Sequence, residues 1–415
     1  MTDTTGDFEE QIGYALDEGA DAKGLNEVIT HVNDAYNKSK DWRQQSDEHR
    51  WLQAYRNYRG LYSSDVQFTE AERSRVFIKV TKTKVLAAYG QIIDVLFAKT
   101  KFPITIDPTT LPEGVSESVY FDPKERPEEI EDDGPASPYG SRDDEEELPK
   151  GATLYSLTKR LGPLADKLRG IKNLKEGAGT TPTAVTFSPA EIAAKKMEKK
   201  IHDQLEESNA SKHLRSSIFE CVLFGTGILK GPFAVDKEYP SWNEEGGYEP
   251  VTKVVPQAAH VSIWDFYPDP DASNMDEALY VVQRHKLSKS QLRALKKRPF
   301  FRQEAIEESI ASGGTYTREY WENDLKDYFI NESPDRYEIL EYWGTIDTET
   351  AKEYGMDLPK EFEDTDEIQI NCWICNNMIL RLVANPFQPT RIPYFAVPYE
   401  LNPYSFFGIG LAENM

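Results

Sequence analysis

The C-terminal stretch of the chain, from Pro386 to Met415, reads PFQPTRIPYFAVPYELNPYSFFGIGLAENM. Its prolines fix backbone φ angles, and its aromatic side chains present large apolar faces. Together these properties predict a stiff, extended segment that packs on the rest of the molecule. The run Gly408-Ile409-Gly410 then predicts the start of a helix, which we expect to begin near Gly410.

The composition of the whole chain indicates a folded protein of two or three domains. The sequence has 415 residues, of which 39% are hydrophobic and 12% are aromatic, enough to build apolar cores. Its 48 lysines and arginines against 71 aspartates and glutamates give a net charge of -23. Proteins that grip DNA usually carry a basic domain, so this balance argues against that class.

The sequence carries no signal for secretion or for membrane insertion. The first residues, MTDTTGDFEE, are acidic and polar, unlike a signal peptide. No apolar run approaches the length of about eighteen residues that spans a bilayer. Three cysteines in a chain of this length make no disulfide framework. We therefore expect synthesis in a reducing compartment and no contact with a membrane.

Helices are predicted for residues 1–110, the first of four parts into which we divide the chain. Apolar residues recur at three- and four-residue spacings from about Asp7 to Tyr58, and again from Val76 to Phe97. Pro103 to Pro108 predicts a short strand between two prolines. This part is therefore expected to be mainly helical.

The second part, residues 111–187, is typical of an acidic insertion or linker. It holds many prolines and acids and few large apolar residues. Leucines spaced from Thr153 to Leu174 predict some helix within it, which Gly162-Pro163 should break or kink.

The remaining parts combine helices and strands, so the predicted fold class is α+β, with antiparallel strands following N-terminal helices. Residues 188–335 are expected to hold a β-rich core, and residues 336–415 to be β-rich and to lead into a further helix. The predicted helices are Ser188–Glu207, Ser211–Phe224, Ser288–Lys297, Gln303–Ala311 and Arg318–Tyr328. The predicted strands are Ile228–Val235, Val251–Val255, Val261–Phe266, Ala278–Arg284, Tyr337–Ile346, Ile368–Ile374 and Met378–Val383, the last two joined by a tight turn at Asn376-Asn377.

Three motifs suggest chemistry at first, and each has a better structural explanation. Gly225 to Gly231 lacks the Gly-Lys-Ser/Thr that opens a helix in a phosphate-binding loop, so its glycines are expected to end a helix. Cys372 and Cys375 have no further zinc ligands nearby, and strand alternation points them to opposite faces. Asp265 to Asp271 fails the spacing of a calcium loop and predicts a turn. We therefore predict no catalytic residue, no cofactor and no metal site.

One basic region stands out against the acidic background. It follows Arg284-His285-Lys286 and comprises Lys289, Arg293, Lys296, Lys297, Arg298 and Arg302. On a helix, the first four of these residues share one side. Such a side is either a solvated helix face or a contact surface for a partner's acidic surface or a nucleic-acid backbone. These six residues are the candidate interface that the sequence offers.

Several segments, in order along the chain, resemble the portal proteins of tailed bacteriophages, especially short-tailed ones. They are Arg59-Gly60-Leu61-Tyr62, Arg75-Val76-Phe77, Ile92 to Phe97, Phe224 to Lys230, Phe266 to Pro270, Glu341 to Gly344, Asn385-Pro386 and Phe406 to Gly410. Each segment is short, but their order covers most of the chain apart from the acidic insertion.

The resemblance implies a structural protein without an active site. Portal proteins form a ring, typically of twelve subunits, at one vertex of the capsid of the virion. Such a ring nucleates head assembly with the major capsid and scaffolding proteins and docks the terminase large subunit. It passes double-stranded DNA without reading its sequence and joins the head to an adaptor or tail protein. The resemblance also implies synthesis in the cytoplasm of a bacterial host.

In the family, a stem and a clip follow the helix that begins near Gly410. We therefore expect this chain to be the N-terminal, wing-bearing part of a longer portal protein. Two other functions are considered beside it. One is another head-tail adaptor or collar protein. The other is a carboxylate-metal nuclease, for which the many acids provide groups but no site constellation.

Overall fold

The computed structural model describes residues 15–16, 22–62, 66, 68–69, 76–97, 102–108, 189–242, 247–326, 335–356, 358, 365–385, 387 and 392–415. The chain divides into two compact units, one of residues 1–104 with 201–415 and one of residues 105–200. The predicted acidic insertion at 111–187, with its helix at Thr153–Leu174, lies outside the described residues. The fold is α+β, as the sequence predicted.

The N-terminal part of the first unit is helical. Its described helices are α2 (Ala22–Ser46), α3 (Glu48–Arg59) and α4 (Val80–Phe97). Helix α3 ends because Gly60 takes a left-handed conformation with a φ of 75°, and its N–H bonds back to the Arg56 carbonyl. Among the described residues, the predicted helical stretch from Asp7 to Tyr58 therefore forms two helices joined at Asp47. Its earlier part is not helical where it is described, because Ala15 makes an antiparallel β-bridge with Val383.

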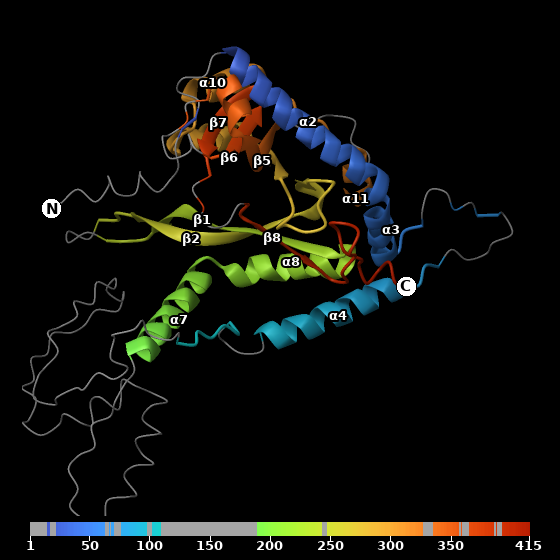
Figure 1. The fold of residues 1–415 in the computed structure, drawn as a ribbon. Helices are drawn as coiled ribbons and strands as arrows, with labels where there is room; N and C mark the ends of the chain where they lie inside the picture. Colours follow the sequence, from blue (N-terminus) through green and yellow to red (C-terminus); the bar gives the residue numbers. More distant parts are fainter. Residues whose placement is uncertain are drawn as a thin grey trace, which may run out of the picture. The chain divides into compact units, whose positions relative to one another are not determined.

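A five-stranded antiparallel sheet forms the centre of the first unit, in the order β3-β4-β5-β6-β7. Its strands are β3 (Phe266–Pro268), β4 (Tyr280–Leu287), β5 (Tyr337–Asp347), β6 (Glu367–Cys375) and β7 (Met378–Ala384). Helix α2 covers one face, as Figure 1 shows. It buries a stripe at helical spacing, including Val28, Val32 and Ala35, against Tyr342, Ile370 and other sheet residues.

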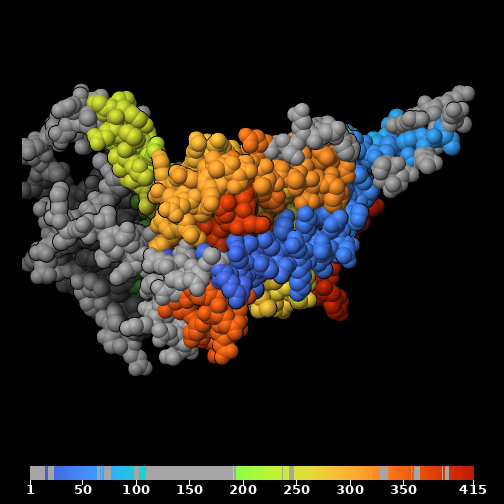
Figure 2. All heavy atoms as spheres, turned by 90° about the horizontal axis from the view of Figure 1, so that it is seen from above, coloured from blue at the N-terminus to red at the C-terminus, as the bar shows by residue number. Residues whose placement is uncertain are grey.

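Short helices cover part of the opposite face of this sheet. They are α9 (Lys289–Ala294), a 3-10 turn at Leu295–Lys297 and α10 (Gln303–Ala311). Leu292, Phe301 and Ile306 pack there with Ile339 and Trp373 of the sheet. Helix α11 (Tyr320–Lys326) instead packs on α3, where the Tyr55 hydroxyl donates to the Leu325 carbonyl, and α12 (Thr348–Glu353) lies on the α2 side, where Ala351 packs with Val28. Seen from above in Figure 2, the blue helix α2 is bordered by the orange residues of this region. An ion pair at 2.6 Å joins Lys40 of α2 to Glu319, the residue before α11.

A second, three-stranded antiparallel sheet has the order β2-β1-β8. Its strands are β1 (Thr226–Tyr239), β2 (Val251–Val261) and β8 (Tyr394–Pro398), and helices α8 (Ala210–Phe224) and α7 (Pro189–Glu207) precede them in the chain. Figure 1 shows α8 lying under this sheet and α4 next to α8. A close backbone contact supports this packing, because a Cβ on Gly227 of β1 would come within 2.4 Å of the Ser217 carbonyl oxygen of α8.

The C-terminal segment packs against the turn between α8 and β1. Gly225 ends α8 with a φ of 99°. The Leu411 N–H donates to the Val222 carbonyl at 3.0 Å, and the Gly408 N–H donates to the Thr226 hydroxyl at 2.9 Å. The prediction that residues 386–415 include an extended segment packed on the body is confirmed, because β8 pairs with β1 and Phe407 is fully buried.

Arg43 of α2 is a buried cation that ties three elements together. Its guanidinium pairs with Glu48 of α3 at 2.9 Å and donates hydrogen bonds to the backbone carbonyls of Ile263 and Phe266. A buried guanidinium needs such partners because its charge loses the solvation of water. The contact fixes α2 and α3 against the start of β3.

Several sequence predictions are confirmed. Helix α10 has the predicted bounds, Gly225 turns a helix into a strand, and Asn376-Asn377 forms a turn with φ angles of 51° and 58°. Cys372 and Cys375 lie in apolar clusters on opposite faces of the five-stranded sheet.

Three further predictions of strands or helices are wrong. The strand at Val261–Phe266 is interrupted by a 3-10 turn at Ile263–Asp265, whose apolar side chains are buried without strand pairing. Residues 102–108, including Pro103–Pro108, form no strand. Residues 411–414 form turns where a helix was expected. The predicted parts 188–335 and 336–415 share both sheets, because β8 pairs with β1 and β5 pairs with β4.

The glycines where the C-terminal segment packs on the α8–β1 turn leave no room for a larger side chain. A Cβ on Gly408 would lie 2.6 Å from the Glu400 carbonyl oxygen and 2.7 Å from that of Gly225. We expect Gly408→Ala to lower the free energy of unfolding by about 3 kcal/mol, because backbone atoms must move. Urea denaturation measures this.

The matched control is Gly90→Ala in helix α4, where a Cβ meets nothing within 4 Å. Alanine is the better helix former, so this change should raise the free energy of unfolding by up to about 1 kcal/mol. Equal effects of the two substitutions would contradict the close packing at Gly408.

Candidate functional site

The basic residues singled out in the sequence lie on one segment, but they do not form one helix side. Helix α9 ends at Ala294, and the chain continues as a 3-10 turn to Lys297. Lys289, Arg293 and Lys297 are exposed. Lys296 is half-buried and forms an ion pair with Glu307 of α10. The expected single face of four cations is therefore wrong, because the tighter turn redirects Lys296 toward α10.

The last two predicted residues, Arg298 and Arg302, lie beside strand β7. Both are exposed, and the Arg302 N–H donates to the Leu380 carbonyl at 2.8 Å. Arg381 of β7 has its pKa lowered chiefly by burial, while the charges of Glu341 and Arg298 also act on it. The basic segment thus continues toward a buried group of charges between the two sheets.

That buried group centres on Lys230 of β1 and Glu341 of β5. The Lys230 ammonium donates to the Glu341 carboxylate at 2.6 Å, and the exposed fractions of the two side chains are 13% and 1%. His285 of β4 contacts the same oxygen of the carboxylate, Oε2, at 2.6 Å, and the Trp343 indole N–H donates to Oε1 at 2.8 Å. The His285 ring stacks on Trp373 at 5.1 Å.

The charge state of Glu341 follows from these neighbours. Burial by itself raises the pKa of a carboxyl, but Lys230 and His285 hold the pKa of Glu341 well below its ordinary value. The carboxylate is therefore ionised and paired. Its hydrogen bonds are used within the fold, so the group joins the two sheets and offers no free nucleophile or base.

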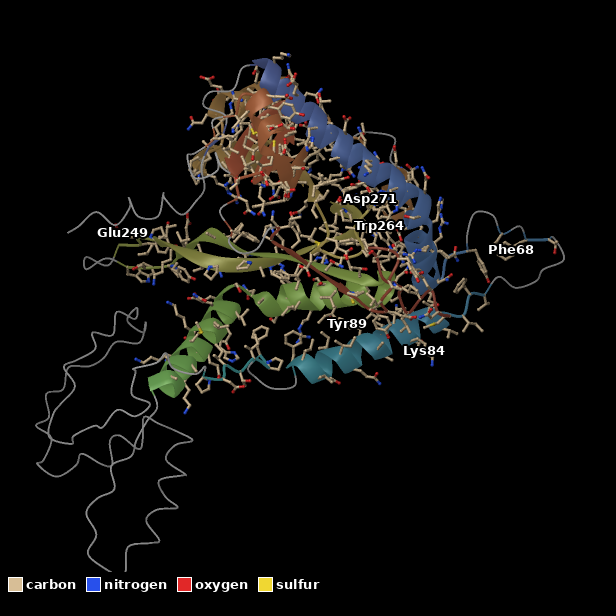
Figure 3. The ribbon with its side chains drawn as sticks, viewed as in Figure 1. Phe68, Lys84, Tyr89, Glu249, Trp264 and Asp271 are labelled. Carbon is tan, nitrogen blue, oxygen red and sulfur yellow. The ribbon has the colours of Figure 1, made fainter. Side chains whose placement is uncertain are left out.

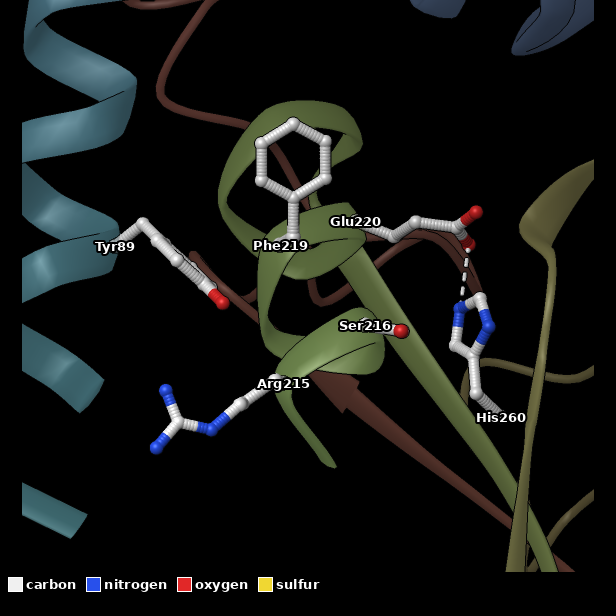
Figure 4. A pocket seen from close by; sticks show the side chains of 6 residues that line it. All are labelled: Tyr89, Arg215, Ser216, Phe219, Glu220 and His260. Atoms are coloured by element: carbon white, nitrogen blue, oxygen red, sulfur yellow. Dashed lines mark ion pairs between the residues drawn. The ribbon is translucent and has the colours of Figure 1, made fainter. Parts of the chain in front are cut away.

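A pocket of about 350 Å³ lies between α4, α8 and β2 (Figure 4). Glu220 and His260 form an ion pair across 3.2 Å, and the Glu220 carboxylate accepts hydrogen bonds at 2.9 Å from Ser262 and from the Ile263 N–H. Arg215 lies over the Phe97 ring at 4.7 Å. The Ser262 hydroxyl is thus hydrogen-bonded to a carboxylate, and the polar groups of the pocket hold α8 to the end of β2 and to α4.

Within the part of the chain that the structure describes, no group of three or more His, Cys, Asp or Glu residues is placed to hold a metal ion. None of the described helices has the length and apolar composition needed to cross a membrane.

Sequence reasoning missed the exposed apolar surfaces, which gather on three regions of the first unit. The first is the outer face of α4 with the residues before it, where Val95 is 79% exposed and Ile78 is 77% exposed. The second is the far end of the β1–β2 hairpin. The third is β8 with the segment after it, including Phe395, Val397 and Leu401. The signal for the first was present, because α4 is apolar on more than one side.

Comparison of the sequence with models of known protein families finds no match, and comparison with curated proteins finds none either.

The buried charge pair makes a prediction about stability. Lys230→Met removes the cation and leaves Glu341 buried without its main partner. We expect the free energy of unfolding to fall by about 3–5 kcal/mol. The double variant Lys230→Met/Glu341→Met should recover most of this loss, because no uncompensated charge remains. A double variant as unstable as the single one would contradict the pairing.

The same pair sets a dependence on pH. A carboxyl whose pKa is lower in the folded protein stabilises the fold above its unfolded pKa, near 4.3, and this contribution disappears as the pH falls further. Wild-type stability should therefore decrease more steeply below about pH 4.5 than that of the double variant. Urea denaturation at several pH values measures the difference.

The exposed basic residues predict a salt-sensitive contact. Reversing Lys289, Arg293 and Lys297 to glutamate should weaken self-assembly at low salt, because these cations then no longer attract an acidic surface. The fold should remain, because all three side chains are exposed. Native mass at low and at high salt provides the measurement. An unchanged mass at low salt would exclude this segment from the contact.

Proposed function

We propose that this chain is a phage portal protein, which forms a ring at one vertex of the capsid through which DNA is packaged and ejected. The ring, of twelve copies in the family that the sequence resembles, would nucleate head assembly and join head to tail. This function requires extensive contacts between copies and no catalysis of its own. The features that support it are therefore surfaces and not reactive groups.

The observation that carries the proposal is the number of large apolar side chains exposed on α4 and on the residues before it. Val80, Leu86 and Val95 point away from the core, and Val76 and Ile78 before the helix are also exposed. Single exposed apolar residues are ordinary on protein surfaces, but several on one helix and its approach mark a contact with another molecule. In a chain that resembles a ring-forming protein, a second copy is the natural occupant.

The charge of the chain suits a conduit for DNA. Each phosphate that binds to a lysine or arginine releases counterions, so a basic lining would hold the DNA and slow its passage. A net charge of -23 instead repels the polyanion. The buried cations Lys230, Arg43 and Arg284 are paired with acids inside the fold and do not add to an outer basic surface.

The proposal includes the partners of such a ring. The terminase large subunit would bind during packaging, an adaptor or tail protein afterwards, and capsid and scaffolding proteins during head assembly. The protein would lie at the vertex of the virion after synthesis in the bacterial host. No enzymatic activity is proposed, and the described pocket and buried charges are used to hold the fold together.

The test of the proposal is the assembly state of the purified protein. Electron micrographs of particles seen end-on should show closed rings with a central opening. Purified protein that stays monomeric at micromolar concentration, or that cleaves DNA with magnesium, would contradict the proposal. The second result would favour a nuclease.

Substitutions on α4 sharpen this test. Leu86→Asp and Val95→Asp place a charge on the apolar face, and we expect either change to dissociate the ring, since burying an unpaired carboxylate is costly. Circular dichroism should show the same helix content, because both side chains are exposed in the single chain. Thr30→Asp, at an exposed polar position of helix α2, is the matched control and should have a much smaller effect. A full-size ring in all three variants would exclude α4 from the contact.

A further inference from the structure

Strands β1 and β2 extend beyond the sheet to which they belong. Strand β8 pairs with β1 only from Thr226 to Lys230, whereas β1 pairs with β2 as far as Tyr239 and Val251. From Phe233 onward the two strands therefore form a ribbon with no third strand. Figure 1 shows this hairpin leaving the body of the unit. A two-stranded ribbon has little stability alone, so contacts made by its exposed side chains would stabilise it.

The far end of this hairpin, which we call the tip, is both apolar and acidic. Trp242 is 68% exposed and Tyr248 is 60% exposed, and their rings contact each other edge to face at 5.5 Å. Val251 and Val254 beside them are exposed as well. Glu238 and Glu249 are exposed on the tip, and the sequence has no lysine or arginine between positions 238 and 252. In Figure 3, Glu249 marks this end of the ribbon.

The outer face of α4 has the complementary character. Its exposed valines and leucine are accompanied by Lys79, Lys82 and Lys84, and no aspartate or glutamate occurs between positions 76 and 93. Lys84, labelled in Figure 3, is exposed. The basic segment at 289–302 is also positive, but none of its large apolar side chains is among the exposed ones. Only α4 therefore matches the tip, among the described surfaces, in both apolar area and charge.

We infer that the tip of the β1–β2 hairpin docks on the outer face of α4 in a neighbouring copy of this chain. The inference rests on the proposed function and names the contact that closes the ring. Trp242 and Tyr248 would cover the apolar residues of α4, and glutamates of the tip would lie beside its lysines. The two surfaces belong to different elements, so each copy gives its tip to one neighbour and receives the tip of the other. This is a heterologous contact, which rings require.

Charge reversal on each side tests this contact. One variant carries Glu238→Lys and Glu249→Lys on the tip, and the other carries Lys82→Glu and Lys84→Glu on α4. In each variant alone, like charges meet at every contact. We expect the protein concentration at half-assembly to rise about tenfold in low salt. Native mass or mass photometry measures the assembly.

Mixing the two variants gives the decisive result. In an alternating ring, the reversed tip of one variant meets the reversed α4 of the other, and the remaining contacts are wild-type. The mixture should therefore assemble like the wild-type protein although neither variant does so alone. Glu353→Lys, an exposed reversal on α12, is the control and should assemble normally.

The outcomes separate this inference from the proposed function. Wild-type rings together with variants that assemble normally, or that fail to rescue each other, would overturn the tip–α4 contact and leave the ring function standing. Rescue of the tip variant by reversing Arg293 and Lys297 would assign the contact to the basic segment and also overturn the inference. A wild-type protein that forms no ring would remove both.

Discussion

One buried charge pair between the two described sheets restricts how these sheets can be placed against each other. Lys230 comes from the three-stranded sheet and Glu341 from the five-stranded sheet, and both are removed from water. Separating or sliding the sheets would leave each charge without its partner in an apolar surrounding, which is far more costly than losing an apolar contact. Because α8 and α4 are packed under β1, this constraint also sets the position of the surfaces proposed to meet other copies.

Much of the fold was predictable from periodicity and turn chemistry. Alternation marked β5, β6 and β7, helical spacing marked α8 and α10, and Gly225 and Asn376-Asn377 marked turns that need left-handed φ angles. The failure at Val261–Phe266 has a physical reason. Ile263 and Trp264 are both fully or nearly buried, and a short apolar run has the same appearance whether it pairs as a strand or turns into a core.

The candidate site was less predictable. The cations from Lys289 to Arg302 were visible as a cluster, but the end of α9 at Ala294 and the pairing of Lys296 with Glu307 depend on tertiary packing. Nothing in the sequence relates Lys230 to Glu341, because they lie far apart in the chain and on different sheets. The apolar residues of α4 were visible as a helical pattern, but that pattern does not say whether they pack inside this chain or against another molecule. Only the structure distinguishes an inner face from an outer one.

The pairing between β1 and β2 shifts in register between Lys230 and Phe233. Such irregularities bend a strand and weaken the ladder locally. The hairpin therefore has an elbow just outside the sheet, while the segment inside it is fixed by β8 and the buried lysine. In the proposed ring, this bend would set the direction in which each hairpin leaves its own copy toward the neighbour.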